Sequence, residues 1–154
     1  MLLDANILLF AADSRSPYHD RASAWLTRSL NGDARVGLPW ESLAAFVRIA
    51  THPRASEHPL TPSDAWGFVT EWLAAATTWV PLPTERHVEV LGGLVEKYGL
   101  AGNLVPDGHL AALAIEHGLE VCSTDTDFAR FREIRWRDPL AEAPPEPVAD
   151  PDAS

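Results

Sequence analysis

The sequence predicts an α/β fold with a mainly parallel central sheet, and three observations support this prediction. Short apolar runs alternate with segments of helical periodicity, which is the order expected of β-α-β crossover units. The 154 residues suit one domain with a single core. Apolar residues make up 46% of the chain and six residues are tryptophan, so the composition is globular.

The first half of the chain begins with an apolar strand over residues 2–4, followed by a short helix over residues 7–12. Ser16 and Pro17 are typical of a helix start, and predict a helix that ends near Gly32. A second strand is expected over residues 35–38, with a helix beginning at Trp40. Thr61 and Pro62 begin another helix. Its apolar residues Trp66, Val69, Leu73 and Ala76 follow helical spacing, with Phe68 and Trp72 alongside. This aromatic face is expected either to be buried internally or to pair with a second subunit.

The second half continues the alternation. A third strand is expected over residues 78–82 and a helix over residues 88–98, followed by a glycine-rich loop over residues 99–103. Pro106 and Asp107 predict the start of a helix that Gly118 closes. A fourth strand over residues 120–124 and a short last strand over residues 134–136 complete the predicted sheet.

The formal net charge of −10 argues against a surface that coats nucleic acids, because such binding neutralises phosphates with lysine and arginine. It does not exclude a nuclease, since bound divalent cations reverse the local charge of an acidic site. We expect residues 1–138 to form the folded domain. Residues 139–154 form an acidic, proline-rich tail that is expected to be disordered.

Cys122, the only cysteine, lies in an apolar stretch, where a buried thiol is the expected role. The N-terminus lacks the basic segment of a signal peptide, and no stretch approaches the roughly 20 apolar residues of a membrane span. We therefore expect a cytoplasmic protein that does not bind membranes.

Acidic side chains recur where predicted strands end or helices begin. Asp4 follows the first strand and Asp125 the fourth, while Glu41 and Asp107 lie at the starts of helices. For any one of these residues, helix capping or compensation of the helix dipole is the simpler explanation. Because the carboxyl ends of parallel strands share one edge of a sheet, we expect the four carboxylates to meet in one crevice.

Clustered carboxylates repel one another unless protons or cations intervene. Oxygen ligands favour Mg²⁺ or Mn²⁺, and no cysteine or histidine cluster has the spacing of a zinc site. Such ions activate water and stabilise charge on an attacked phosphate, which favours phosphodiester hydrolysis. The sequence contains no local nucleophile motif and no Walker or Rossmann glycine loop.

The order and spacing of several short segments resemble those of a known protein family. They are Asp4-Ala5-Asn6 with Ile7-Leu8-Leu9, Pro39-Trp40-Glu41, the run from Gly102 to Ala114, the run from Ser123 to Phe128, and more weakly Thr51-His52-Pro53-Arg54 and Thr84-Glu85-Arg86-His87. From Met1 to about Leu140 the chain resembles PIN-domain ribonucleases, specifically VapC toxins of toxin–antitoxin systems. The resemblance implies a three-layer α/β/α sandwich and Mg²⁺- or Mn²⁺-dependent cleavage of RNA that leaves a 5′-phosphate and a 3′-hydroxyl. It also implies a homodimer and inhibition by a cognate antitoxin protein.

The resemblance also implies roles for individual residues. Asp4 and Asp107 correspond to the most direct metal ligands, Asp125 to a metal ligand or water-positioning group, and Glu41 to a ligand or proton-handling group. Together these four form the implied catalytic and metal-binding set. Three further residues have supporting roles: Asn6 and Thr124 would orient the acids by hydrogen bonds, and Asp127 would either cap the following turn or support the metal.

Other functions remain open at this point. A catalytically silent regulatory PIN domain that binds an antitoxin, or a housekeeping PIN nuclease without an antitoxin, would share the fold. A phosphatase or phospho-receiver also places aspartates at strand ends, but would need a lysine nearby, and the only one, Lys97, lies within a predicted helix. His109 follows Asp107 closely, but helix geometry is expected to turn it away, so it receives no catalytic role.

Overall fold

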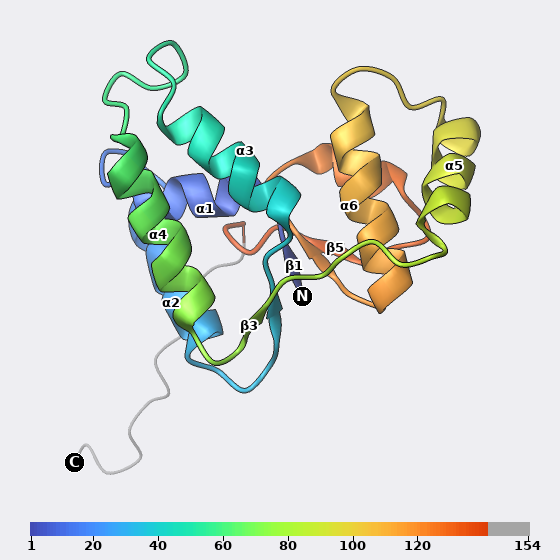
Figure 1. The fold of residues 1–154 in the computed structure, drawn as a ribbon, viewed down its shortest axis with the longest axis horizontal. Helices are drawn as coiled ribbons and strands as arrows, with labels where there is room; N and C mark the ends of the chain where they lie inside the picture. Colours follow the sequence, from blue (N-terminus) through green and yellow to red (C-terminus); the bar gives the residue numbers. More distant parts are fainter. Residues whose placement is uncertain (142–154) are drawn as a thin grey trace, which may run out of the picture.

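The structure, a computed structural model, describes residues 1–141, and they form a three-layer α/β/α sandwich (Figure 1). Five short strands make one parallel sheet in the order β3-β2-β1-β4-β5. The predicted fold class is therefore confirmed. The strands are β1 (Leu2–Leu3), β2 (Val36–Gly37), β3 (Thr78–Trp79), β4 (Val121–Cys122) and β5 (Trp136–Arg137).

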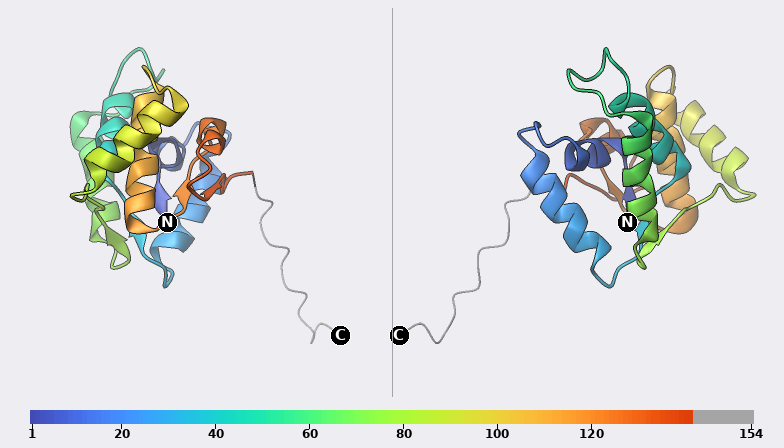
Figure 2. Two further views of the ribbon diagram at one scale, coloured as in Figure 1. Left: turned by 90° about the vertical axis from the view of Figure 1, so that its right-hand side faces the viewer. Right: turned by 60° about the vertical axis from the view of Figure 1, so that its left-hand side comes forward.

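Six α-helices and one 3₁₀-helix within residues 1–141 connect these strands. They are α1 (Ala5–Ala12), α2 (His19–Leu30), α3 (Trp40–Ala50), α4 (Pro62–Ala74), α5 (His87–Tyr98), α6 (Leu104–His117) and the 3₁₀-helix η1 (Thr126–Arg130). Figure 2 shows α1 and α2 on one side of the molecule and α5 and α6 on the other.

The sheet separates two hydrophobic cores. Leu3 and Cys122, which are paired neighbours in β1 and β4, point into a core covered by α1, α2, α3 and α4. Leu2 and Val121, the preceding pair, point into a core covered by α5 and α6. Successive strand residues face opposite sides, and both sides are covered, so these strands are apolar throughout.

Two helix starts differ from the prediction. Helix α2 begins at His19 rather than at Pro17, because Ser16 closes a turn of its own: its hydroxyl accepts a hydrogen bond from the N–H of Tyr18. Helix α6 begins at Leu104, two residues before Pro106. A proline fits in this first turn because an N–H there would have no partner within the helix.

Helix α4 begins as predicted, with Thr61 accepting a hydrogen bond from the N–H of Asp64 at 3.1 Å. The structure divides its aromatic residues, since Trp72 is buried and Trp66 is 49% exposed. Trp72 packs on Phe46 of α3 at a ring separation of 4.8 Å. Trp66 instead stacks on the exposed Trp40, with the rings 8° from parallel.

The packed body extends to Leu140, which is buried beside Ile7 and Ala22. Residues 142–154, which make up most of the predicted tail, lie outside the described residues, so the domain boundary and tail disorder stay predictions. Cys122 is buried as expected, and burial raises the pKa of its thiol to about 11. None of the helices within residues 1–141 is both long enough and apolar enough to cross a membrane.

Candidate functional site

Asp4 lies between the end of β1 and the start of α1, and its side chain caps the N-terminus of this helix. One carboxylate oxygen accepts a hydrogen bond from the N–H of Ala5 at 2.7 Å, and the other accepts one from the hydroxyl of Ser123 at 2.7 Å. Burial raises the pKa of Asp4, the two hydrogen bonds lower it in part, and the charge of Asp125 raises it again. Asp4 is thus a rigidly held carboxylate.

Ser123 is the centre of this network, at the end of β4. Its buried hydroxyl donates to Asp4 and accepts hydrogen bonds from the side-chain amide of Asn6 and from the N–H of Asp125, both at 3.0 Å. Ser123 was not among the residues that the sequence predicted for the site. The available signal was a small polar residue at the end of an apolar strand, two residues before Asp125.

Asn6 and Thr124 both contact the network, but in different ways. Asn6 donates to Asp4 at 3.2 Å, and its side-chain carbonyl accepts a hydrogen bond from the N–H of Thr124 at 3.3 Å. Asn6 therefore lies where its side chain can orient the carboxylate of Asp4. Thr124 contributes its main-chain N–H, which donates to Asn6.

Three carboxylates converge beside Asp4, and we call Asp107, Asp125 and Asp127 the carboxylate cluster. One oxygen from each lies within 4.8 Å of the others. Asp107 comes from the first turn of α6, and the other two come from the start of η1. Asp125 caps this turn by accepting the N–H of Asp127 at 2.9 Å. Asp127 also pairs with Arg130 at 3.1 Å.

The carboxylate cluster carries unbalanced negative charge. Burial, followed by repulsion from Asp125, Asp4 and Asp127, raises the pKa of Asp107 to about 6, although Arg130 opposes this. A cation would relieve the repulsion, and three carboxylates are the oxygen donors that Mg²⁺ and Mn²⁺ prefer. The donor set therefore fits the predicted metal.

Glu41 does not join this cluster. It lies in the first turn of α3, its side chain is 42% exposed, and one carboxylate oxygen lies 2.8 Å from Nε2 of His109. His109 follows Asp107 by two residues and so leaves α6 on a different side. Its Nε2 faces Glu41. The four predicted acids thus divide into Asp4, Asp107 and Asp125 on one side and Glu41 on the other.

Sequence comparison assigns the chain to a family. The family model described as PIN domain matches residues 1–134. Ribonuclease VapC33 of Mycobacterium tuberculosis is 42% identical over 139 residues, which cover 90% of this chain and 97% of that protein.

Two solved structures share the fold at low sequence identity. VapC20 of Mycobacterium tuberculosis, described as a sarcin-ricin loop cleaving toxin, has a TM-score of 0.62 and 14% identity, covering 87% of this chain and 98% of its own. VapBC2 from Rickettsia felis, bound to a DNA fragment from their promoter, has a TM-score of 0.62 and 16% identity, covering 88% and 96%. The chain belongs to the PIN-domain family and, within it, to the VapC group.

Proposed function

We propose that this protein is a Mg²⁺- or Mn²⁺-dependent endoribonuclease and the toxin component of a toxin–antitoxin pair. The observation that carries this proposal is the convergence of Asp107, Asp125 and Asp127 within 4.8 Å, beside the fixed carboxylate of Asp4. The likeness to VapC33, a protein named as a ribonuclease, supports RNA as the substrate.

The carboxylate cluster would hold the ion, with Asp4 adjoining it. A bound divalent ion supplies a water of lowered pKa and positive charge for the attacked phosphate. The protein's own contribution is to hold its carboxylates still: Ala5 and Ser123 fix Asp4, and the cap on η1 fixes Asp125. A fixed set of ligands costs little reorganisation when the substrate arrives.

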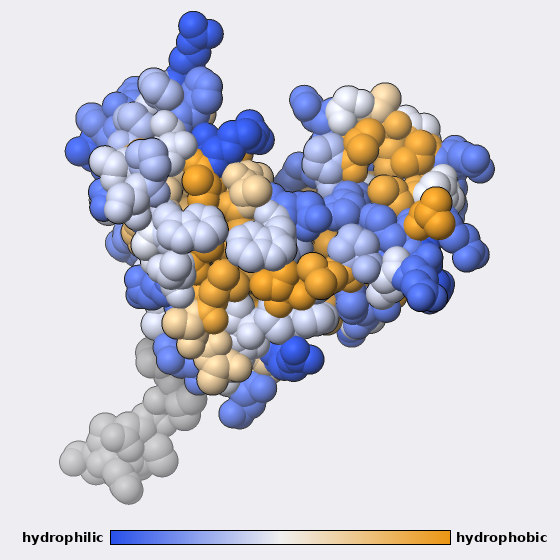
Figure 3. All heavy atoms as spheres, viewed as in Figure 1, coloured by the Kyte–Doolittle hydropathy of each residue, from blue (hydrophilic) through white to orange (hydrophobic). Residues whose placement is uncertain are grey.

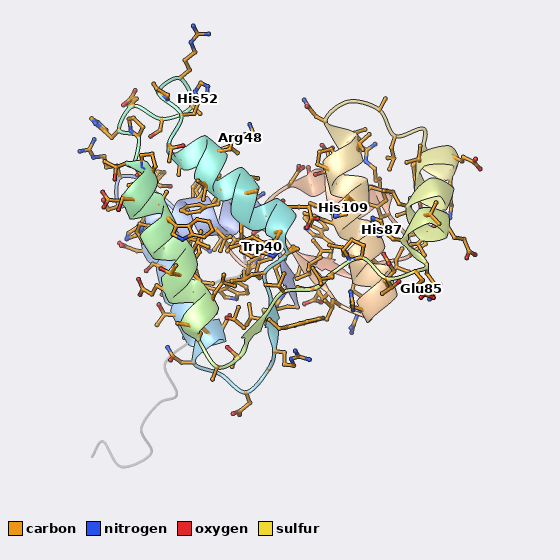
Figure 4. All side chains as sticks on the ribbon, viewed as in Figure 1. Trp40, Arg48, His52, Glu85, His87 and His109 are labelled. Atoms are coloured by element: carbon orange, nitrogen blue, oxygen red, sulfur yellow. The ribbon has the colours of Figure 1, made fainter. Side chains whose placement is uncertain are left out.

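The RNA path we propose follows a hollow in the surface. Figure 3 shows the molecule hollowed between the side that carries α3 and α4 and the side that carries α5 and α6. Figure 4 places His109, the partner of Glu41, in this region. A single RNA strand in the hollow would pass Glu41 and approach Asp107, which shares the first turns of α6 with His109.

For the antitoxin we propose a cavity of about 660 Å³ between the end of α1, the end of α3 and the loop that follows α3. Its lining is apolar at Phe10, Phe46 and Leu60, with the charged residues Arg15 and Glu57 beside them. Concave apolar sites with a few charged groups suit an amphipathic peptide segment.

For the homodimer we propose the surface around Trp40 and Trp66. Their stacked rings are 44% and 49% exposed. Exposed aromatic side chains of this size are typical of protein interfaces. Sedimentation of the wild-type protein and of Trp66→Ala would test this: a monomeric wild type would contradict the dimer.

RNA cleavage tests the proposed activity. The purified full-length protein should cut members of an RNA panel in the presence of Mg²⁺ or Mn²⁺, and EDTA should stop the reaction. Asp4→Asn and Asp107→Asn should abolish cleavage while the circular dichroism spectrum is unchanged. Unchanged cleavage in both variants would contradict the site.

Two further outcomes separate the related functions. Cleavage without growth arrest on expression, in cells that lack an antitoxin, would indicate a housekeeping nuclease. Binding to a co-expressed antitoxin, with no cleavage anywhere in the RNA panel, would indicate a silent regulatory domain.

A further inference from the structure

The end of helix α3 and the loop that follows it carry a group of basic side chains. Residues 42–56 contain two arginines, Arg48 and Arg54, and no acid, in a chain whose 22 acidic residues outnumber its 12 lysines and arginines. With His52 these arginines line a small pocket of about 230 Å³, and the rest of its lining is uncharged. We call Arg48, His52 and Arg54 the basic patch. It includes most of the segment over residues 51–54, which the carboxylate cluster does not use.

The two guanidinium groups of the basic patch are unpaired. Both arginines are exposed, and within residues 1–141 neither side chain forms a hydrogen bond or an ion pair. By contrast, Arg130 pairs with Asp127, and Lys97 pairs with Glu133. Each guanidinium has five N–H donors in a planar arrangement that matches phosphate oxygens. The donors of the basic patch are therefore available to an anionic ligand.

The loop of the basic patch is held in shape by its own hydrogen bonds. Nδ1 of His52 accepts a hydrogen bond from the N–H of Arg54 at 3.0 Å, and the carbonyl of His52 accepts one from the N–H of Ser56 at 3.2 Å. The hydroxyl of Thr51 donates to the carbonyl of Val47 at 2.7 Å and so closes the end of α3. Because Nδ1 is an acceptor, the ring hydrogen of a neutral His52 is on Nε2, which can donate to a ligand.

The basic patch lies along the same side of α3 as Glu41. Arg48 follows Glu41 by seven residues, which is close to two helical turns, so the two side chains leave the same face about 10 Å apart along the axis. Between them on this face are Ala44 and Ala45, whose small side chains leave it open. Figure 4 shows Arg48 on the side of α3 that faces α6, and His52 beyond the end of the helix. The basic patch therefore borders the hollow proposed as the RNA path.

RNA is a polyanion, and both the net charge of −10 and the carboxylate cluster repel it. Contacts between basic side chains and phosphates supply much of the affinity of protein–RNA complexes. We propose that Arg48, His52 and Arg54 bind backbone phosphates of the substrate RNA to one side of the bond that is cut, and so position that bond at the carboxylate cluster. This proposal rests on the proposed function and assigns a binding role, not a catalytic one.

Fluorescence anisotropy of labelled RNA tests the proposal, with the full-length protein in EDTA so that binding is measured apart from cleavage. The probe is a single-stranded oligouridine of about 12 nucleotides. Arg48→Ala and Arg54→Ala should each raise Kd about fivefold at low salt. Each should also reduce the slope of log Kd against log salt concentration by about 0.7, the value for one phosphate contact with a single strand. His52→Ala should raise Kd as well, because it removes a donor and the acceptor that holds Arg54.

Arg28→Ala is the matched control, because it removes the same charge from an exposed position in the last turn of α2. It should change neither Kd nor the salt slope, and an equal loss in this variant would assign the effect to net charge and overturn the proposal. Arg48→Lys keeps the charge and should restore most of the affinity. An oligoadenosine of the same length should show the same losses, since phosphates carry no sequence information.

Cleavage kinetics with Mn²⁺ separate binding from catalysis. Arg48→Ala and Arg54→Ala should raise KM about fivefold and leave kcat nearly unchanged, because a phosphate contact away from the cut bond is made equally in the ground state and the transition state. A lower kcat with an unchanged KM would contradict the binding role.

The outcomes also distinguish the basic patch from the proposed nuclease function. If the wild type cuts no RNA but Arg48→Ala and Arg54→Ala weaken its RNA binding, the nuclease function fails while the phosphate site stands. If the wild type cuts RNA and both variants keep its Kd and salt slope, the basic patch is overturned while the nuclease function stands. Unchanged RNA binding with weaker capture of a co-expressed antitoxin would assign the two arginines to the antitoxin and would also overturn the proposal.

Discussion

The two ends of helix α6 carry acids whose pKa values shift in opposite directions on folding. The helix dipole favours a negative charge at Asp107, near the N-terminus, and disfavours one at Glu116, near the C-terminus. The pKa values show the reverse: that of Asp107 is raised to about 6, and that of Glu116 is lowered. Burial raises both pKa values and is the largest cause at Asp107, where the neighbouring charges add to it, whereas at Glu116 the hydrogen bonds outweigh it.

The neighbours differ in charge and in hydrogen bonding. Asp107 faces the carboxylates of Asp125, Asp4 and Asp127, while Glu116 receives hydrogen bonds from Thr84 and His87. Direct charges and hydrogen bonds within a few ångströms exceed a dipole effect of about 0.3–1 kcal/mol. The negative charge around Asp107 is thus one that a cation would relieve, whereas Glu116 finds its hydrogen-bond donors within the protein.

Ser123→Ala should have the largest effect, because one hydroxyl serves Asp4, Asn6 and Asp125. We expect the free energy of unfolding to fall by about 1–3 kcal/mol, since buried polar groups lose their partner. Cleavage should fall about 10- to 100-fold. Urea denaturation and initial rates measure the two effects.

Thr77→Val is the matched control for Ser123→Ala. It removes a hydroxyl that donates to the carbonyl of Leu30, at a place away from the acidic site. It should lower stability but leave cleavage unchanged. Equal loss of cleavage in both variants would mean that Ser123 acts only through stability.

Metal affinity should depend on pH through Asp107. Below a pKa of about 6 its carboxylate is protonated and no longer a ligand, so the affinity for Mn²⁺ should fall up to about tenfold per pH unit. Calorimetric titration with Mn²⁺ at pH 7.5, 6 and 5 measures this. Constant affinity over this range would contradict a metal-ligand role for Asp107.

Substitution of the two acids of α6 should shift stability in opposite directions when no metal is added. The folded-state pKa of Asp107 is raised, so this group adds stability at low pH that is lost as pH rises from about 4 through 6. Asp107→Asn should therefore stabilise the protein at pH 7.5. The expected gain is only about 1 kcal/mol, because solvent screens the charge of this half-buried group.

Glu116→Gln should lower stability at the same pH. The pKa of Glu116 is depressed on folding, so its contribution is present above the unfolded pKa and is lost as pH falls through the folded one. Thermal melts in EDTA measure both variants. A shift of the same sign in both would remove the distinction between the two ends of α6.

The sequence predicted the fold class and the order of its elements because hydrophobic periodicity and helix signals are local. The start of α4 at Thr61 and Pro62 and the close of α6 at Gly118 follow from single residues whose backbone preferences are strong. The buried face of α4 could not be predicted, because aromatic residues lie on two sides of the helix. Which tryptophan is buried depends on where Phe46 and Trp40 lie.

The sequence by itself determined that acids follow the first and fourth strands and begin the helices at Glu41 and Asp107, and the parallel sheet brings three of the four to one edge. Only the tertiary structure decided that Ser123 joins Asp4 to Asp125, and that Glu41 pairs with His109 rather than with the other acids. The reason is physical: strand order fixes where a residue lies to within a turn, but hydrogen-bond partners depend on the direction of each side chain. Those directions are set by residues more than a hundred positions away for Asp4, and by helix packing for Glu41.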